Sequence, residues 1–221
     1  MSEKVDECKA GVVKGFAVKW AVVFLIGFTL TACGHDASDA GFGSAEAPKT
    51  SNYFPSEVDD EVWIDLSQVD EPSLFNSRAI KDHKSRYRLS ISGISCVEYV
   101  IRIDESHAGR LNGIVKHRNK CKRTGIVDEH AFFPSRIEFA KLEELIEAAG
   151  MFQHYPEFWV SSDEEDTICL DGNQLLFERR ILQDYRISMA NAQCTAPVEL
   201  HQVAQQFVAM SGENDAGSLL Q

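Results

Sequence analysis

The sequence predicts an α+β fold, in which a mainly antiparallel sheet carries two helices packed on one face. Two kinds of periodicity lead to this prediction. Several short segments alternate between apolar and polar residues, which is typical of strands with one buried face. Two longer segments repeat apolar residues every three or four positions, which is typical of amphipathic helices. A sheet with one apolar face, covered by such helices, makes a two-layer domain.

Strands are predicted at four places in the first half of the domain. Residues 62–66 alternate and predict a first strand at an edge of the sheet. Residues 86–92 alternate more clearly, which predicts a half-buried strand with Tyr87, Leu89 and Ile91 on one face and Arg86, Arg88, Ser90 and Ser92 on the other. Residues 96–104 follow the same pattern, and Gly109 and Gly113 bracket a further strand that runs through Val115.

Residues 136–149 are the best helix candidate. Ser135 can cap its N-terminus, and Glu138, three residues later, completes a capping box. One apolar stripe runs along the helix, made by Leu142, Leu145, Ile146 and Ala149. Gly150 is placed to end the helix in the left-handed conformation.

The second half of the domain predicts a hairpin and a closing helix. Residues 168–170 run into Asp171-Gly172, a strong turn signal, and strands are predicted at 174–181 and 184–190. A helix over about 196–210 follows, with Thr195 as its cap and Pro197 in its first turn, where a missing N–H costs little. Gly212 is expected to end it.

Four of the six cysteines lie in the predicted domain: Cys96, Cys121, Cys169 and Cys194. Four cysteines allow three pairings. The favoured pairing joins Cys96 to Cys121 and Cys169 to Cys194, because both pairs enclose the same separation and each would tie neighbouring strands together. No pair has the close spacing of a zinc site or of a C-x-x-C redox centre, so we predict two disulfides.

The N-terminus predicts an export signal. A lysine-bearing stretch, residues 1–19, precedes the apolar run 20–30. A run of about 11 residues is typical of a signal peptide and too short for a spanning helix, which needs ~20. The chain then reads Leu30-Thr31-Ala32-Cys33. The alternatives are an ordinary secreted protein or a short membrane anchor.

These four residues resemble the bacterial lipobox. The resemblance implies cleavage between Ala32 and Cys33 and diacylglycerol on the Cys33 sulfur. Gly34 stands where aspartate would signal retention in the inner membrane, so the resemblance implies the outer membrane, facing the periplasm. Several acyl chains together anchor a protein stably.

The predicted organisation has four parts. Residues 1–32 are the signal peptide, and 33–58 are the lipidated cysteine with a flexible tether rich in Gly, Ala, Ser, Asp and Pro. Residues 59–212 are the α+β domain, and 213–221 are expected to be a disordered tail.

Residues 86–210 resemble a group of uncharacterised bacterial secreted proteins and lipoproteins. The resemblance rests on Cys96 before Val97-Glu98-Tyr99, on Gly113, on the helix that ends Ala149-Gly150-Met151-Phe152, and on Asp171-Gly172. Because that group has no established chemistry, the resemblance implies a fold rather than a function.

The formal charge of −12 argues against nucleic acid as a partner, because phosphates attract cations. One basic cluster nevertheless stands out, and its candidate anion-binding residues are Lys116, His117, Arg118, Lys120, Lys122 and Arg123. It predicts either a site for lipid phosphates, lipopolysaccharide or an acidic protein, or a solvated hairpin loop whose charge prevents aggregation. The solvated loop is favoured.

Two further clusters are ambiguous. Residues 163–166 are all acidic but lack the spacing of a calcium loop, so a solvated loop is favoured. The aromatic stretch 151–159 could stack on sugars such as those of peptidoglycan, although core packing is favoured directly after a helix. No catalytic signature is present, the seven histidines are scattered, and neither a metal nor a cofactor is predicted.

We therefore expect a membrane-anchored envelope lipoprotein, a non-enzymatic binding or accessory module whose domain meets another envelope component. The alternatives are a glycan- or anionic-lipid-binding protein and a periplasmic enzyme.

Overall fold

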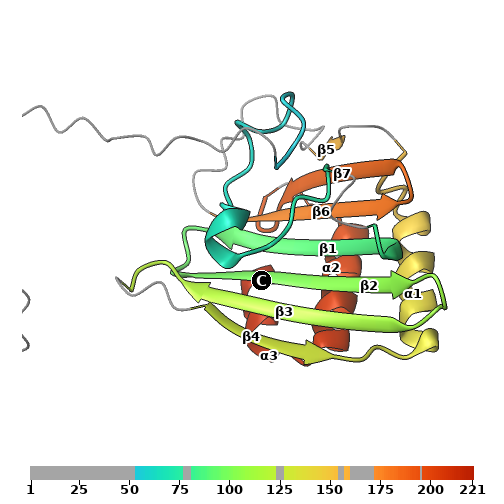
Figure 1. Cartoon of the computed structure of the whole chain (residues 1–221). Coiled ribbons are helices and arrows are strands. Elements are labelled where there is room, and N and C mark those ends of the chain that lie inside the picture. The colour runs from blue at the N-terminus through green and yellow to red at the C-terminus, as the bar shows by residue number, and fades with distance from the viewer. Residues whose placement is uncertain (1–52, 77–80, 123–126, 154–156, 160–171, 195) are drawn as a thin grey trace, which may run out of the picture. The chain divides into compact units, whose positions relative to one another are not determined.

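Seven strands of the described chain form one sheet, and both of its faces are covered (Figure 1). The computed structural model describes residues 53–76, 81–122, 127–153, 157–159, 172–194 and 196–221. They all belong to one compact unit, residues 46–221. Six strands pair antiparallel and a short seventh pairs parallel, so the predicted α+β class is confirmed.

The sheet has the order β4-β3-β2-β1-β6-β7-β5. Its strands are β1 (His83–Gly93), β2 (Val97–Ser106), β3 (Leu111–Asn119), β4 (Val127–Phe132), β5 (Glu157–Trp159), β6 (Asn173–Ile181) and β7 (Asp184–Asn191). The strands predicted at 86–92, 96–104, 174–181 and 184–190 are confirmed. The predicted strand through Val115 extends to Asn119, so the first half of the cluster expected to be a loop lies in β3. Strand β4 was not predicted from the sequence.

The centre of the sheet is apolar on the side that faces the helices. Leu89 of β1 lies opposite Ile101 of β2 and Phe177 of β6, and all three side chains are buried. Figure 1 shows the helices α1 and α2 behind this face. Because β-strand side chains alternate, one row of each strand enters the core while the other points to the opposite face.

Gly113 makes room for an aromatic ring on the core face. It pairs with Phe132 of β4, and a Cβ atom at this position would lie 2.2 Å from the Phe132 ring. No side chain other than hydrogen fits there unless the ring moves. The glycine therefore lets Phe132 close the core at the β4 end of the sheet.

Helix α1 (Arg136–Ala148) forms as predicted. The Ser135 hydroxyl accepts a hydrogen bond from the Glu138 N–H, and the Glu138 carboxylate accepts one from the Ser135 N–H. This capping box satisfies two N–H groups that the first turn leaves unpaired. The apolar stripe packs inward through Phe139, Leu142 and Ile146, which are all buried.

Helix α2 (Val198–Ser211) also forms and ends at Gly212 in the left-handed conformation, as predicted. Its N-cap is Pro197 without a side-chain hydrogen bond, so the prediction that Thr195 caps it is wrong. Among the described helices, none is long and apolar enough to cross a membrane.

The predicted disordered tail is helical instead. Residues after α2 form α3 (Asn214–Gly217) and the 3₁₀ helix η3 (Ser218–Leu220). Ala216 and Leu220 are buried in the core between sheet and helices. These two apolar side chains order the tail because burying them removes apolar surface from water.

The other face of the sheet is covered by residues 53–76, which lie in front of it in Figure 1. This segment contains the 3₁₀ helix η1 (Leu66–Val69) and otherwise turns or irregular chain. The predicted strand at 62–66 is therefore wrong. Phe54 and Val58 are buried, so the domain begins before the predicted boundary at residue 59.

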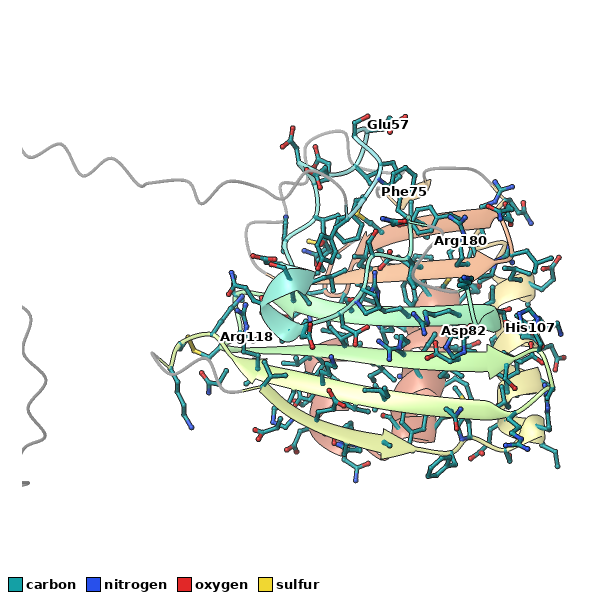
Figure 2. All side chains as sticks on the ribbon, in the orientation of Figure 1. Glu57, Phe75, Asp82, His107, Arg118 and Arg180 are labelled. Carbon is teal, nitrogen blue, oxygen red and sulfur yellow. A yellow bond between two sulfur atoms is a disulfide. The ribbon has the colours of Figure 1, made fainter. Side chains whose placement is uncertain are left out.

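Polar side chains of the sheet bind the backbone of this covering segment. Lys116 donates to the carbonyls of Val69 (3.0 Å) and Asp70 (2.7 Å), and Arg88 donates to that of Pro72 (2.7 Å). Arg180 donates to the carbonyl of Phe75 (3.1 Å), and Figure 2 shows these two residues close together. Irregular chain leaves carbonyls without ladder partners, so buried donors of the sheet are needed to satisfy them.

Ion pairs neutralise Lys116 and Arg88 beneath the segment. Glu71, whose side chain is fully buried, accepts from Arg102 at 2.6 Å and lies 3.2 Å from Lys116 and 3.6 Å from Arg88. Arg88 in turn donates to Glu178 at 2.7 Å. The strand at 86–92 is therefore buried on both faces and not half-buried as predicted.

Glu105 joins the sheet to the start of α1. Its carboxylate accepts from Arg136 of α1 (2.9 Å), Ser85 of β1 (3.0 Å) and Lys84 (3.1 Å). Burial raises the pKa of Glu105, but these three hydrogen bonds outweigh it and hold the pKa below its ordinary value.

The disulfide Cys96–Cys121 is present and joins the start of β2 to the chain after β3. Cys169 lies outside the described residues, as do Cys33 and the Asp171 position of the predicted hairpin turn. Cys194 takes part in a disulfide bond whose partner is not among the described cysteines.

Replacing Glu71 with glutamine should lower the free energy of unfolding by about 3–5 kcal/mol, because buried cations lose their shared carboxylate. Urea denaturation of the variant measures this loss. Glu61→Gln is the matched control, since the Glu61 side chain is exposed in the same segment. Equal stability of the two variants would contradict a central role for Glu71.

Replacing Glu105 with glutamine should lower the free energy of unfolding by about 1–2 kcal/mol at pH 7. The pKa of Glu105 is lower in the folded protein than in the unfolded chain. The ionised carboxylate therefore stabilises the fold above the ordinary pKa of glutamate, and this stabilisation is lost as the pH falls through the folded-state pKa. The difference between wild type and variant should therefore shrink below about pH 4.5. Urea midpoints measured between pH 7 and pH 3 test this, and a difference that does not change with pH would contradict it.

Candidate functional site

The predicted anion-binding cluster is divided between the two faces of the sheet. Lys116 and Arg118 point to the face under residues 53–76, where both are buried. Arg118 pairs with Glu98 at 2.5 Å and also donates to Gln68, and Figure 2 shows it beside η1. These two cations have partners within the domain, so they do not form the exposed basic surface that the sequence suggested.

The other members of the cluster lie apart from these two. His117, between them in β3, points to the helix side, where it lies 3.1 Å from Asp128 and its ring contacts that of Tyr99. Lys120 donates to the carbonyl of Gly93 and lies 3.6 Å from Glu98. Lys122 is exposed, and Arg123 lies outside the described residues.

The other candidate residues predicted from the sequence do not come together in one site within the described chain. Met151 and Phe152 pack into the core, as favoured, and residues 154–156 and 160–171, with the acidic cluster, lie outside the described chain. His130 pairs with Glu213 at 3.4 Å. Within the described ranges, no three histidine, cysteine or carboxylate side chains gather as a metal site would require.

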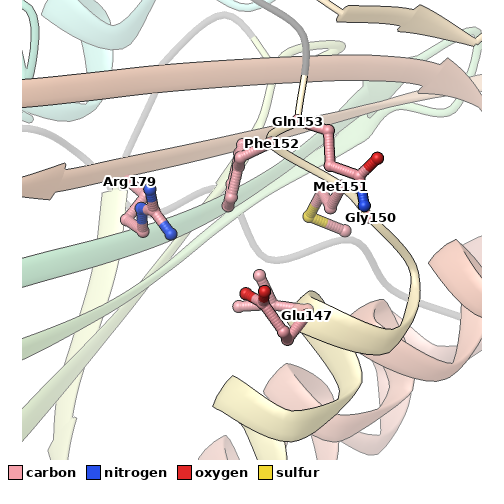
Figure 3. A pocket seen from close by; sticks show the side chains of 7 residues that line it. Glu147, Gly150, Met151, Phe152, Gln153 and Arg179 are labelled. Atoms are coloured by element: carbon pink, nitrogen blue, oxygen red, sulfur yellow. The ribbon is translucent and has the colours of Figure 1, made fainter.

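A pocket that the sequence analysis did not predict lies where α1 ends against β6. Its volume is about 230 Å³, and its lining consists of Ile146, Glu147, Gly150, Met151, Phe152, Gln153 and Arg179. Figure 3 shows Arg179 beside Phe152 at one side of this space and Glu147 of α1 at another. The pocket therefore combines opposite charges with apolar walls.

The end of α1 forms one wall of the pocket. The N–H of Met151 donates to the carbonyl of Ile146, and the N–H of Gly150 donates to the backbone carbonyl of Glu147. This pair of hydrogen bonds is a Schellman motif, which requires a left-handed residue. Gly150 supplies it with a φ of 61°, which confirms the predicted helix end and turns Met151 and Phe152 back toward the sheet.

Arg179 is a cation on the apolar, helix-facing side of the sheet. It lies opposite Tyr87 of β1 and shares its strand face with Leu175 and Phe177. Its Nη2 donates to Asp184 at 3.1 Å, and its guanidinium carbon lies 5.1 Å from the centre of the Phe152 ring. This distance allows a cation–π attraction, which holds the side chain over the ring.

One polar atom of Arg179 is left over. Its Nε is buried and finds no hydrogen-bond acceptor among the residues that the structure describes. A buried donor without an acceptor costs about 1–3 kcal/mol. The Arg179 side chain is therefore held in place although one of its donors has no acceptor among the described groups.

Tyr87 lies beside Arg179 on the adjacent strand β1. Its hydroxyl donates to Glu143 of α1 at 3.0 Å. Burial, reinforced by the Glu143 carboxylate, raises the pKa of the Tyr87 phenol, and Arg179 opposes this shift. The phenol is therefore a neutral hydrogen-bond donor at physiological pH, and it fixes α1 against β1.

One signal in the sequence indicates this site. Side chains of the strand at residues 173–181 alternate between the two faces of the sheet. Leu175 and Phe177 are buried on one face, and Arg179 lies on that same face. A cation in an apolar row marks a position where the core ends or a partner is bound. The position of the α1 end above it depends on tertiary packing and has no local signal.

Comparison of the chain with known proteins finds no matching family model, no matching curated protein and no matching solved structure.

Proposed function

We propose that the chain is the precursor of a lipid-anchored envelope protein, whose domain binds another component as a non-enzymatic module. The observation that carries the anchor is Cys33, placed directly after an apolar run and two small residues. Cleavage before Cys33 and acylation of its sulfur would leave the mature domain on the membrane. From Gly34, we assign it to the outer membrane, facing the periplasm.

The disulfide Cys96–Cys121 supports export. Disulfides persist in oxidising compartments such as the periplasm and are rare in the cytosol. The bond encloses a separation of 25 residues. By loop closure, it stabilises the domain by roughly 3–4 kcal/mol. The domain gains this stability only in a compartment where the two thiols are oxidised to a disulfide, which is why the bond supports export.

The pocket at the end of α1 supports binding rather than catalysis. The described residues that line it offer a guanidinium, an amide, one carboxylate and apolar groups, and no serine, cysteine or histidine is among them. These groups can orient a ligand through hydrogen bonds and apolar contact. Because both sheet faces are covered by the domain itself, this pocket is a more suitable contact point than the middle of either face.

We also propose that Cys194 pairs with Cys169. Cys194 is disulfide-bonded, and its separation from Cys169 equals the 25 residues between Cys96 and Cys121. This bond would tie the chain after β7 to the residues before β6. The domain would then have the two disulfides that its sequence predicts.

The anchor is tested by replacing Cys33 with alanine. Wild type should be cut before Cys33, incorporate labelled fatty acid and partition into detergent, because its acyl chains insert into the bilayer. The variant should remain uncut and unlabelled. Cys8→Ala is the matched control, since that cysteine lies in the segment removed by cleavage. A Cys33→Ala protein that matures and partitions like wild type would refute the proposed anchor.

The disulfides are tested by digestion without reducing agent, followed by mass spectrometry of the linked peptides. We expect one peptide pair joining Cys96 to Cys121 and another joining Cys169 to Cys194. Reduction of the first bond should lower the free energy of unfolding by roughly 3–4 kcal/mol. A Cys169 thiol that reacts with iodoacetamide in the native protein would contradict the second pairing.

A further inference from the structure

Charged side chains line the pocket at the end of α1, which distinguishes it from an ordinary packing defect. A gap between apolar side chains is lined by apolar atoms and stays dry. Here Arg179 has a buried Nε without an acceptor in the described chain, and Glu147 stands across the space from it. Both charges line the cavity, together with the Gln153 amide.

Arg179 is held in place for a carboxylate. The Phe152 ring lies beside its guanidinium carbon at 5.1 Å, and Asp184 takes only Nη2. A guanidinium fixed by an aromatic ring loses little side-chain freedom on binding. Carboxylates match the planar guanidinium group, from which they can accept two parallel hydrogen bonds.

Glu147 gives the pocket a preference for a positively charged group, opposite to the preference of Arg179 for an anion. It lies in the last turn of α1, and its side chain is exposed apart from its contact with the cavity. A simple anion would be repelled by this carboxylate, whereas an ammonium group would be attracted. The two charges together therefore favour a ligand that carries both signs.

The size and the walls limit what lies between the charges. About 230 Å³ is below the 300–1,000 Å³ of typical drug-sized sites. Ile146, Met151 and Phe152 line it with apolar atoms. Methionine adapts to ligands of different shape because its side chain is unbranched and polarisable.

We propose that this pocket binds a small apolar α-amino acid, with its carboxylate against Arg179, its ammonium toward Glu147 and its side chain against Met151 and Phe152. The site is independent of the lipid anchor, and the proposal rests on the proposed function of the domain as a binding module. Binding neutralises both charges that line the pocket at once. The ligand is held without chemical change.

The proposal is tested by calorimetric titration of the full-length protein, purified in detergent, with L-leucine, L-methionine and L-phenylalanine. At least one should bind. For that amino acid, the N-acetyl derivative lacks the ammonium and the amide lacks the carboxylate, so both should bind at least ten-fold more weakly. An N-acetyl derivative that binds as tightly as the free amino acid would overturn the zwitterion and show a plain anion site.

Variants locate the binding. Arg179→Gln should weaken binding at least ten-fold, and Glu147→Gln several-fold. Arg110→Gln and Glu144→Gln are the matched controls, because both residues are exposed and neither lines the pocket; they should bind within two-fold of wild type. Arg179→Lys keeps the charge and the fold but loses the paired donors, so it should also weaken binding.

Two results would overturn the proposal: no heat from any of the three amino acids, or equal binding by Arg179→Lys, Arg110→Gln and wild type. Unfolding temperatures of all variants confirm that each is folded. A failure here leaves the Cys33 experiment unaffected, because acylation and the pocket involve different parts of the chain.

Discussion

The buried charges under residues 53–76 are the constraint on which this domain depends. Glu71 brings one carboxylate among Arg88, Arg102 and Lys116 on three adjacent strands. Removing such groups from water is costly, and their mutual attraction offsets that cost only where every charge has a partner. The contacts of Glu71 with cations of three strands therefore tie the covering segment to the sheet at this point.

The covering segment owes its place to the same cations. It has little regular structure of its own, so its carbonyls at Val69, Asp70 and Pro72 need donors from elsewhere. Lys116 and Arg88 provide them and remain paired with carboxylates. An apolar cluster that includes Leu66 and Leu74 supplies the burial that drives docking.

On the opposite face, the apolar core positions the candidate site. The stripe of α1 fixes the helix over the sheet, and its Schellman end directs Met151 and Phe152 onto β6. Arg179 lies at the edge of the core, where apolar packing gives way to the pocket. The pocket thus lies where residues at the end of α1 meet Arg179 of β6.

The sequence by itself determined the elements whose signals are local. The alternation at 86–92, the capping box at Ser135 and the glycine ends at Gly150 and Gly212 depend on near neighbours in the chain, and they predicted strands and helix ends correctly. Alternation shows which side chains share a face, but it does not show what covers that face. A polar row such as Arg86, Arg88 and Ser90 suits water as well as buried partners. Only the tertiary structure decided that Glu71 would meet Arg88 and that the end of α1 would meet Arg179, because these contacts join residues far apart in sequence.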